Sequence, residues 1–134
     1  MTDRVFFYGT LMTGFDRRQR AGIDEHKLAY LGRGRISAAL FDLGIYPAAV
    51  PDPDGRVWGE VYQMRVPDEV LRTLDEIEGY CPEEPDASLY TRLEIPIVLE
   101  NGTTETGWAY FYNAPLGRAE RIASGDYLEH LKLK

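Results

Sequence analysis

The sequence predicts an α+β fold: a small, mixed, β-barrel-like sheet with one main helix packed against it. Short apolar stretches that alternate with a period of two recur along the 134 residues, as expected for strands. One strong amphipathic helix pattern lies among them, and glycine and proline separate the stretches. Strands this close in sequence, with one helix between them, are typical of a small closed or mixed sheet.

The first half of the chain reads as short strands separated by turn residues. In the clearest of them, Trp58, Glu60 and Tyr62 share one face while Val57 and Val61 lie on the other. Strands are expected at 5–8, 28–36 and 57–64, the stretch 40–50 with its glycine and proline follows the second of them, and a turn is expected at 51–55.

Residues 67–78 carry the clearest helix pattern. Pro67 stands at the first position, acidic residues fill the first turn and Gly79 follows the last residue. When the residues are projected at about 100° per residue, the apolar side chains fall on one face, which is expected to pack against the sheet. That face comprises Val70, Leu71, Leu74 and Ile77.

A β-hairpin is expected after the helix. Residues 93–99 alternate, Asn101-Gly102 is typical of a two-residue type I′ turn, and aromatic residues alternate on the return strand. Such a turn would pair Ile95 with Trp108 and Leu93 with Tyr110, with the aromatic and aliphatic side chains on one inner face. From residue 118 onward the pattern is helical, with an interruption at Gly125.

The composition indicates one domain, residues 1–134, and excludes several kinds of partner. The formal charge is −7, with 15 Lys and Arg against 22 Asp and Glu, so no nucleic-acid partner is expected. The chain has neither a long apolar span nor the apolar core of a signal peptide, so we expect no membrane partner and a cytoplasmic location. The basic run at 17–20 is expected to be a solvated face, with steering of an anionic substrate as the alternative.

Neither a metal nor a cofactor is expected. Cys81 is the only cysteine, so it has no disulfide partner within the chain. His26 and His130 are the only histidines and lie far apart, so no Cys/His zinc cluster is expected. Cys81 also lacks a histidine partner and is expected to be a half-buried thiol, and no G-x-S-x-G motif offers a serine nucleophile.

Glu78 is the charged residue that stands out on the predicted helix. The projection places it between Leu71 and Leu74, inside the apolar face, where an unpaired carboxylate is costly to bury. Glu78 either turns outward at the helix end or accepts a backbone hydrogen bond there, or it is buried. In the buried case, desolvation and the neighbouring Asp75 and Glu76 would raise its pKa, as in a general acid/base.

Glu60 is the rival carboxylate. It is flanked on its strand face by Trp58 and Tyr62, and it could equally pair with Arg92. We interpret Glu60 as a structural residue or as a support for the site. Asp75 falls at the edge of the solvated helix face in the projection.

Gly9 ends the first strand and allows two interpretations. A glycine after a strand is common in a simple turn. It is also found where exposed backbone N–H groups receive an anionic or carbonyl group of a ligand.

Six short motifs, in chain order, resemble those of the gamma-glutamylcyclotransferase-like family. They are Tyr8-Gly9-Thr10-Leu11, Gly44-Ile45-Tyr46-Pro47-Ala48, Gly59-Glu60-Val61-Tyr62, Leu74-Asp75-Glu76-Ile77-Glu78-Gly79-Tyr80, Tyr90-Thr91-Arg92 and Trp108-Ala109-Tyr110. The resemblance covers roughly residues 5 to 127 and looks strongest to the branch with gamma-glutamylaminecyclotransferases and plant avirulence-induced-gene proteins. Thr10 stands where the family often has serine.

The resemblance implies a small mixed-sheet barrel and a site built from two motifs. The family's Y-G-[ST]-[LN] loop cradles the substrate, and the glutamate that ends its D-x-x-E-G segment is the catalytic acid/base. Gly9 is then expected to let the backbone approach the ligand. The site residues expected from the resemblance are Glu78 as catalytic and Tyr8, Gly9, Thr10, Leu11, Tyr46 and Tyr110 as substrate-binding.

The implied reaction is an intramolecular acyl transfer on a small gamma-glutamyl amide. The substrate's α-amine attacks its own γ-carbonyl, which gives 5-oxoproline and a free amine or amino acid. Tyr110 is expected to orient Glu78 or the substrate. The alternative is a non-catalytic small-molecule-binding protein of the same fold, because both would keep the loop of residues 8–11.

Overall fold

The computed structural model describes residues 2–133; Met1 and Lys134, the ends of the expected domain, lie outside the described residues. The strands are β1 (Arg4–Phe7), β2 (Leu28–Ile36), β3 (Ala38–Asp42), β4 (Pro47–Pro51), β5 (Val57–Met64), β6 (Tyr90–Leu99), β7 (Thr104–Tyr112) and β8 (Glu120–Arg121). The α-helices are α1 (Arg17–Arg20), α2 (Pro67–Glu78) and α3 (Tyr127–Lys132), and 3₁₀ turns lie at η1 (Glu25–Lys27) and η2 (Pro85–Ala87).

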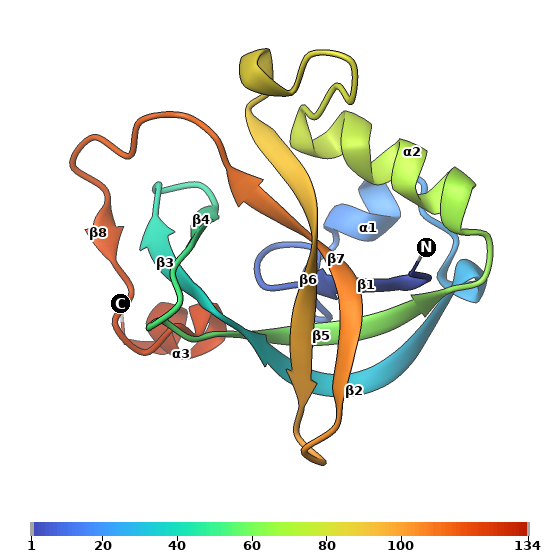
Figure 1. Ribbon diagram of the computed structural model, residues 1–134, viewed down its shortest axis with the longest axis horizontal. Coiled ribbons are helices and arrows are strands. Elements are labelled where there is room, and N and C mark those ends of the chain that lie inside the picture. Colours follow the sequence, from blue (N-terminus) through green and yellow to red (C-terminus); the bar gives the residue numbers. More distant parts are fainter. Residues whose placement is uncertain (1, 134) are drawn as a thin grey trace.

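A closed barrel forms the centre of the molecule. Its strands follow the order β1-β5-β2-β6-β7, and a parallel contact between Val5 of β1 and Trp108 of β7 closes it. Figure 1 shows α2 lying across the barrel and the tip of the β6–β7 hairpin projecting from it. The expected α+β class with a barrel-like sheet and one main helix is confirmed.

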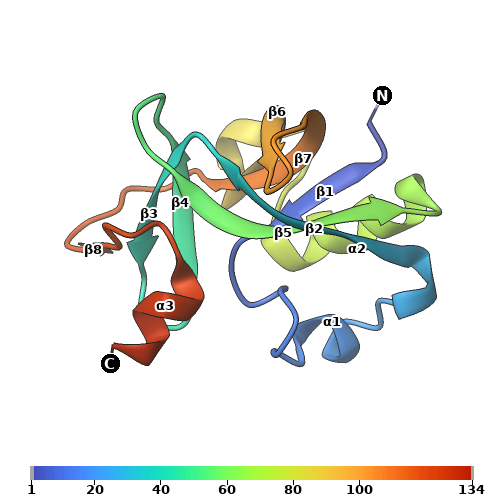
Figure 2. The same cartoon turned by 90° about the horizontal axis from the view of Figure 1, so that it is seen from below.

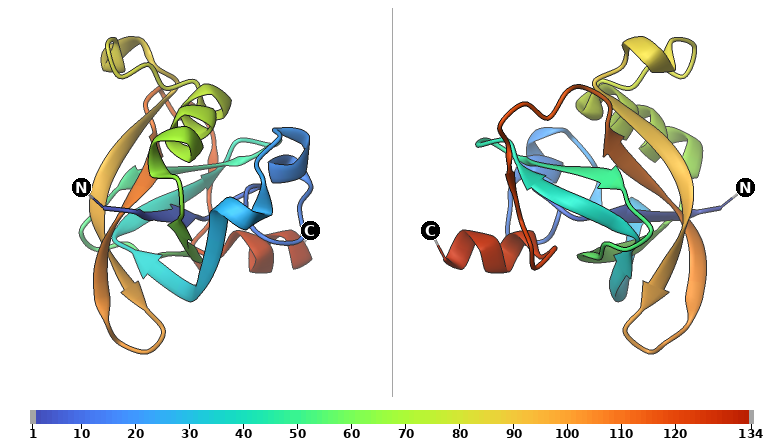
Figure 3. Two further views of the ribbon diagram at one scale, coloured as in Figure 1. Left: turned by 90° about the vertical axis from the view of Figure 1, so that its right-hand side faces the viewer. Right: turned by 60° about the vertical axis from the view of Figure 1, so that its left-hand side comes forward.

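A second, three-stranded sheet lies beside the barrel. Its order is β4-β3-β8, and both pairings are antiparallel. The C-terminal helix α3 lies next to this sheet, on the left in Figures 1 and 2. The two described ends of the chain lie on opposite sides of the molecule in both views of Figure 3.

Helix α2 begins and ends where the sequence predicts. Pro67 occupies its first turn, and Gly79 caps its end in the left-handed conformation with φ of 67°. Its apolar face covers the barrel, since Val70, Leu71 and Leu74 are buried there. The largest fully buried side chains of the core are Phe6, Leu40, Met64, Leu74, Ile97, Val5, Val57 and Val61.

The hairpin has a different register from the one predicted. Ile95 pairs with Gly107 instead of Trp108, and Leu93 pairs with Ala109 instead of Tyr110. The turn is longer by one residue than a two-residue loop, because the N–H of Leu99 donates to the carbonyl of Thr103 and Gly102 takes a φ of 89°. A left-handed glycine in a three-residue loop shifts every later pair by one position.

The C-terminal segment also differs from its prediction. A helical pattern is expected from residue 118, yet residues 120–121 form β8 against β3 and the helix begins only at Tyr127. Gly125, with a φ of 70°, separates the two. Among the described residues, no helix combines the length and apolar composition needed to cross a bilayer.

Candidate active site

A cavity of about 90 Å³ opens between the end of β1, the end of α2 and the β3–β4 turn. All seven residues that the sequence proposes for the site line it together. They are Tyr8, Gly9, Thr10, Leu11, Tyr46, Glu78 and Tyr110. The structure adds Arg17, Pro47 and Tyr90 to the wall, so residues from distant parts of the chain meet at one place.

The carboxylate of Glu78 is buried at this wall. Only 9% of the residue is exposed, so the alternative in which Glu78 turns outward is wrong. The helix ends directly behind it: Gly79 reverses the chain, and the N–H of Tyr80 donates to the carbonyl of Asp75 at 2.9 Å. Glu78 therefore keeps the helical position that points between Leu71 and Leu74 toward the cavity.

The pKa of Glu78 is raised to about 6. Burial is the larger cause, because desolvation disfavours the charged form. The Arg17 guanidinium opposes it, with Nη1 3.7 Å from Oε1 of Glu78. A carboxyl group with this pKa can both accept and return a proton near neutral pH.

The loop after β1 is a turn with free donors. The N–H of Met12 donates to the carbonyl of Gly9 at 3.0 Å, so residues 9–12 form a β-turn. Within residues 2–133, the N–H groups of Gly9, Thr10 and Leu11 donate to no other protein group. The turn interpretation of Gly9 is thus confirmed. The turn also leaves unbonded N–H groups on a loop that lines the cavity, and binding of a ligand by these groups stays a prediction.

Gly9 itself is needed for packing. A Cβ atom at this position would lie 2.7 Å from Cγ of Pro47, closer than side chains tolerate. Pro47 begins β4 and lines the same cavity. The expected role of Gly9, to let the backbone approach a ligand, is therefore accompanied by close contact with the β3–β4 turn.

Arg17 is the charged residue of the cavity wall that the sequence analysis did not assign to the site. Its Nη1 donates to Oγ1 of Thr10 at 2.9 Å, and its Nη2 lies 3.4 Å from the carbonyl oxygen of Ile77. These bonds join the loop after β1 to the end of α2 beside Glu78. The expectation that 17–20 is a solvated face is wrong for Arg17 and for Arg18, which is 8% exposed and ion-paired with Glu25.

Three tyrosines of the cavity wall use their hydroxyl groups within the protein, and that of Tyr90 donates to the carbonyl of Pro47 at 3.2 Å. The Tyr8 hydroxyl donates to the carbonyl of Tyr110 at 2.7 Å and accepts from the N–H of Ala49 at 3.3 Å. The Tyr110 hydroxyl donates to Oδ1 of Asp75 at 2.5 Å. Tyr110 therefore does not hydrogen-bond Glu78, and burial, with the Asp75 carboxylate, raises the pKa of Tyr110.

Asp75 and Arg92 form a buried pair behind the cavity. Arg92 donates to both oxygens of Asp75, at 2.8 and 3.1 Å. The alternative that pairs Arg92 with Glu60 is thus wrong, and Asp75 is buried instead of lying at the edge of the solvated face. One carboxylate holds both Arg92 and Tyr110, which fixes α2 against β6 and β7.

Glu60 lies outside the cavity wall and serves the preceding loop. It accepts hydrogen bonds from the N–H of Thr13 at 2.8 Å and from the Tyr62 hydroxyl at 2.9 Å. These contacts agree with its interpretation as a supporting residue. Cys81 is exposed and not half-buried as expected, and it is absent from the cavity wall.

Comparison with known proteins connects this geometry to a family. A family model described as gamma-glutamyl cyclotransferase, AIG2-like, matches residues 5–129. The gamma-L-glutamyl-butirosin B gamma-glutamyl cyclotransferase of Niallia circulans is 35% identical over 115 residues, which cover 81% of this chain and 66% of that protein. The gamma-glutamylcyclotransferase family protein YtfP of Escherichia coli K12 is 32% identical over 133 residues, 96% of this chain and 99% of YtfP.

Solved structures share the fold. The structure of YtfP from Escherichia coli matches with a TM-score of 0.64 at 29% identity, over 95% of this chain and 97% of that one. YkqA from Bacillus subtilis matches with a TM-score of 0.72 at 23% identity, over 99% of this chain but 42% of YkqA. The chain thus spans less than half of YkqA, and that likeness concerns the fold alone.

Proposed function

The chain belongs to the gamma-glutamyl cyclotransferase, AIG2-like family of enzymes, and we propose that it cyclises a small gamma-glutamyl amide. In this reaction the α-amine of the glutamyl group attacks its own γ-carbonyl carbon. A C–N bond closes the five-membered lactam of 5-oxoproline, and the C–N bond of the amide breaks. The protein needs no nucleophile of its own because the substrate supplies one.

The single observation that carries the proposal is the position of the Glu78 carboxylate. It lies buried in the wall of the same cavity as the unbonded N–H groups of residues 9–11, and its pKa is about 6. In its ionised form Glu78 takes a proton from the substrate's α-ammonium group, which frees the lone pair for attack. Protonated Glu78 then gives this proton to the leaving nitrogen, so that a neutral amine departs. The carboxylate, ionised again, accepts the second proton that the ring nitrogen must lose, and this proton leaves with the released amine, which becomes an ammonium ion.

The loop after β1 supplies hydrogen-bond donors for the negative charge of the substrate. N–H groups of Gly9, Thr10 and Leu11 would stabilise either the glutamyl carboxylate or the oxyanion that forms on the γ-carbonyl oxygen. A folded substrate held between this loop and Glu78 has its amine and carbonyl in contact. Such orientation can lower a barrier by roughly 7–11 kcal/mol.

Gamma-glutamyl amides share the glutamyl part and differ in the amine or amino acid that departs, so the substrate is identified by this leaving group. The Niallia circulans relative is named for gamma-L-glutamyl-butirosin B, so the chain should be tested with this compound, with simple gamma-glutamyl amines and with gamma-glutamyl dipeptides. We expect 5-oxoproline from at least one of these compounds and none from their α-glutamyl isomers. Saturable binding of a gamma-glutamyl amide without 5-oxoproline would instead support the non-catalytic binding protein.

A further inference from the structure

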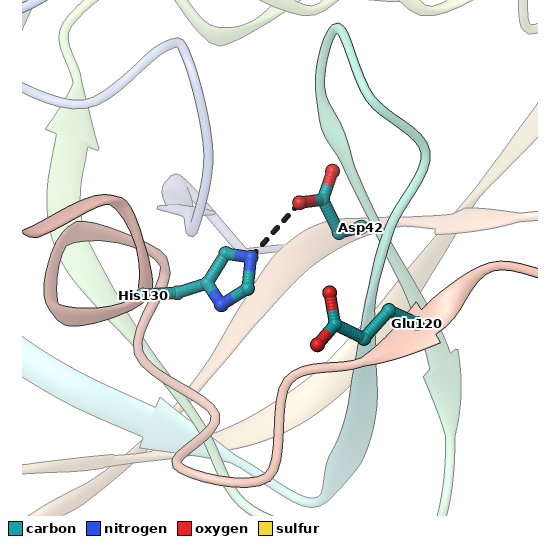
Figure 4. A group of neighbouring side chains, drawn as sticks. All are labelled: Asp42, Glu120 and His130. Atoms are coloured by element: carbon teal, nitrogen blue, oxygen red, sulfur yellow. Dashed lines mark hydrogen bonds and ion pairs between the residues drawn. The ribbon is translucent and has the colours of Figure 1, made fainter. Parts of the chain in front are cut away.

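We propose that Asp42, Glu120 and His130 form a zinc site on the face of the small sheet. Asp42 lies on β3, far in sequence from Glu120 on β8 and His130 on α3. One candidate ligand atom from each lies within 4.8 Å of the others. Figure 4 shows the two carboxylates facing the imidazole ring from adjacent strands.

The backbone brings the two carboxylates together. Asp42 is the last residue of β3 and Glu120 the first of β8, and they are direct partners in the antiparallel pair. Like charges placed directly opposite each other are unfavourable unless something of opposite charge lies between them. A divalent cation would neutralise this pair.

The hydrogen bond between His130 and Asp42 marks where the ion would sit. Nε2 of His130 lies 2.8 Å from Oδ2 of Asp42, and the two side chains are only 13% and 7% exposed. The other oxygen of Asp42 accepts from the N–H of Gly44 at 2.7 Å, which fixes the plane of the carboxylate. A metal ion would replace the proton between Nε2 and Oδ2, as imidazole binds metals in its neutral form.

Only small movements are needed to reach zinc geometry. Bonds of about 2.0–2.1 Å in a tetrahedral site separate the ligand atoms by about 3.3 Å. The His130–Asp42 pair must open slightly, and the widest pair must close by no more than about 1.5 Å. Glu120 is exposed and its side chain can turn to do this.

The donor set favours zinc over magnesium or calcium. One imidazole nitrogen with two carboxylates suits zinc and neighbouring transition metals, whereas magnesium and calcium prefer oxygen ligands alone. Asp42 and Glu120 also line an open hollow together with Gly44 and Arg118. A water molecule could reach a fourth position from that side, and Arg118 is the cation that would compete for the carboxylates.

The site would connect two parts of the molecule. Asp42 pairs with Pro47 across the β3–β4 turn, and the carbonyl of Tyr46 accepts from the N–H of Leu43. Tyr46 and Pro47 line the candidate active site. Zinc bound to Asp42 would therefore hold this turn against the C-terminal helix through His130.

The test is zinc binding by metal-free, untagged protein, measured by isothermal titration without any substrate. We expect one zinc ion per chain, a higher thermal midpoint with zinc but not with magnesium, and slower amide hydrogen exchange at residues 42–47. Glu120→Gln should fold, because Glu120 is exposed, and should weaken zinc binding at least about ten-fold. His130→Gln should weaken it similarly.

Two matched variants serve as controls. His26→Gln removes the other histidine and Cys81→Ser removes the exposed thiol, and both should bind zinc like the wild type. X-ray absorption should show nitrogen and oxygen neighbours without sulfur. Lack of saturable binding, unchanged affinity in Glu120→Gln, or loss of binding in Cys81→Ser would each overturn the site, whatever the outcome for catalysis.

Discussion

Glu78 and Arg17 face each other across the wall of the cavity, with Arg17 Nη1 3.7 Å from Glu78 Oε1. Arg17 is directed chiefly at Thr10, 2.9 Å away, and makes no close bidentate pair with Glu78. Burial therefore prevails over the cation, and the pKa of Glu78 is raised instead of lowered. This balance leads to separate predictions for the two residues.

Replacing Glu78 by glutamine should separate activity from stability. Glutamine keeps the shape but cannot carry a proton at neutral pH, so 5-oxoproline formation should fall at least about 100-fold. The pKa of Glu78 is about 6 in the folded protein, against an ordinary value of 4.5. The stability that protonated Glu78 contributes is therefore fully present below pH 4.5 and is lost as the pH rises through 6. The loss is about 2 kcal/mol, so urea melts should show Glu78→Gln more stable than the wild type at pH 7.

Glu76→Gln is the control on the same helix. Glu76 is exposed, so this variant should keep wild-type turnover and stability at every pH. Wild-type turnover in Glu78→Gln would make Glu78 a structural residue. A large loss of stability as its main effect would lead to the same conclusion.

Arg17 should set the acidic limb of the pH–rate profile. Removing its charge in Arg17→Gln leaves burial unopposed, so the pKa of Glu78 should rise and the limb of kcat/KM should move to higher pH, by on the order of one unit. Arg17→Lys should restore part of the shift. Arg20→Gln, at an exposed position paired with Asp16, should leave the profile unchanged, and an unmoved limb in Arg17→Gln would contradict the coupling.

The sequence predicts most of the fold because its local signals are strong. Pro67 and Gly79 mark both ends of α2 without help from the rest of the molecule. The predicted hairpin register is wrong because Asn-Gly fits both a two-residue and a three-residue loop. The alternation of apolar residues does not show which of the two loops forms. The prediction of a helix from residue 118 is wrong because residues 120–121 form a strand by pairing with β3, which lies far away in sequence.

The candidate site likewise contains residues that local sequence signals predict and residues that only tertiary contacts define. Helical periodicity alone indicates that Glu78 lies on the apolar face, because neighbouring helix positions fix its direction. Periodicity could not identify Arg17 or Asp75 as buried residues. The position of Arg17 depends on its contact with Thr10, and that of Asp75 on its contact with Arg92, and both partners come from other parts of the chain. A basic run and a helix-edge aspartate are solvated in most proteins, and here tertiary packing overrides that tendency.

The loop after β1 should be sensitive at Gly9 and tolerant at Thr10. In Gly9→Ala the new Cβ would press on Pro47, which should cost about 1–3 kcal/mol of stability and shift one wall of the cavity. Binding of a gamma-glutamyl amide should weaken with it. Thr10→Ser keeps the hydroxyl that accepts from Arg17 and should match the wild type in melts and titrations. Equal stability and equal affinity of Gly9→Ala and Thr10→Ser would count against the close packing of Gly9 on Pro47.

Tyr110→Phe distinguishes a structural hydroxyl from one that contacts the substrate. The Tyr110 hydroxyl donates to Asp75, which also holds Arg92, so its removal should cost about 1.5–3 kcal/mol, as for other hydrogen bonds to charged groups. Turnover should stay within a few-fold of the wild type at temperatures where both are folded, because the hydroxyl is not bonded to Glu78. Tyr112→Phe is the control, since the Tyr112 hydroxyl makes no hydrogen bond among the described residues and its ring still packs on Tyr90. A ten-fold or greater loss of kcat in Tyr110→Phe with unchanged melting would instead assign this hydroxyl to the substrate.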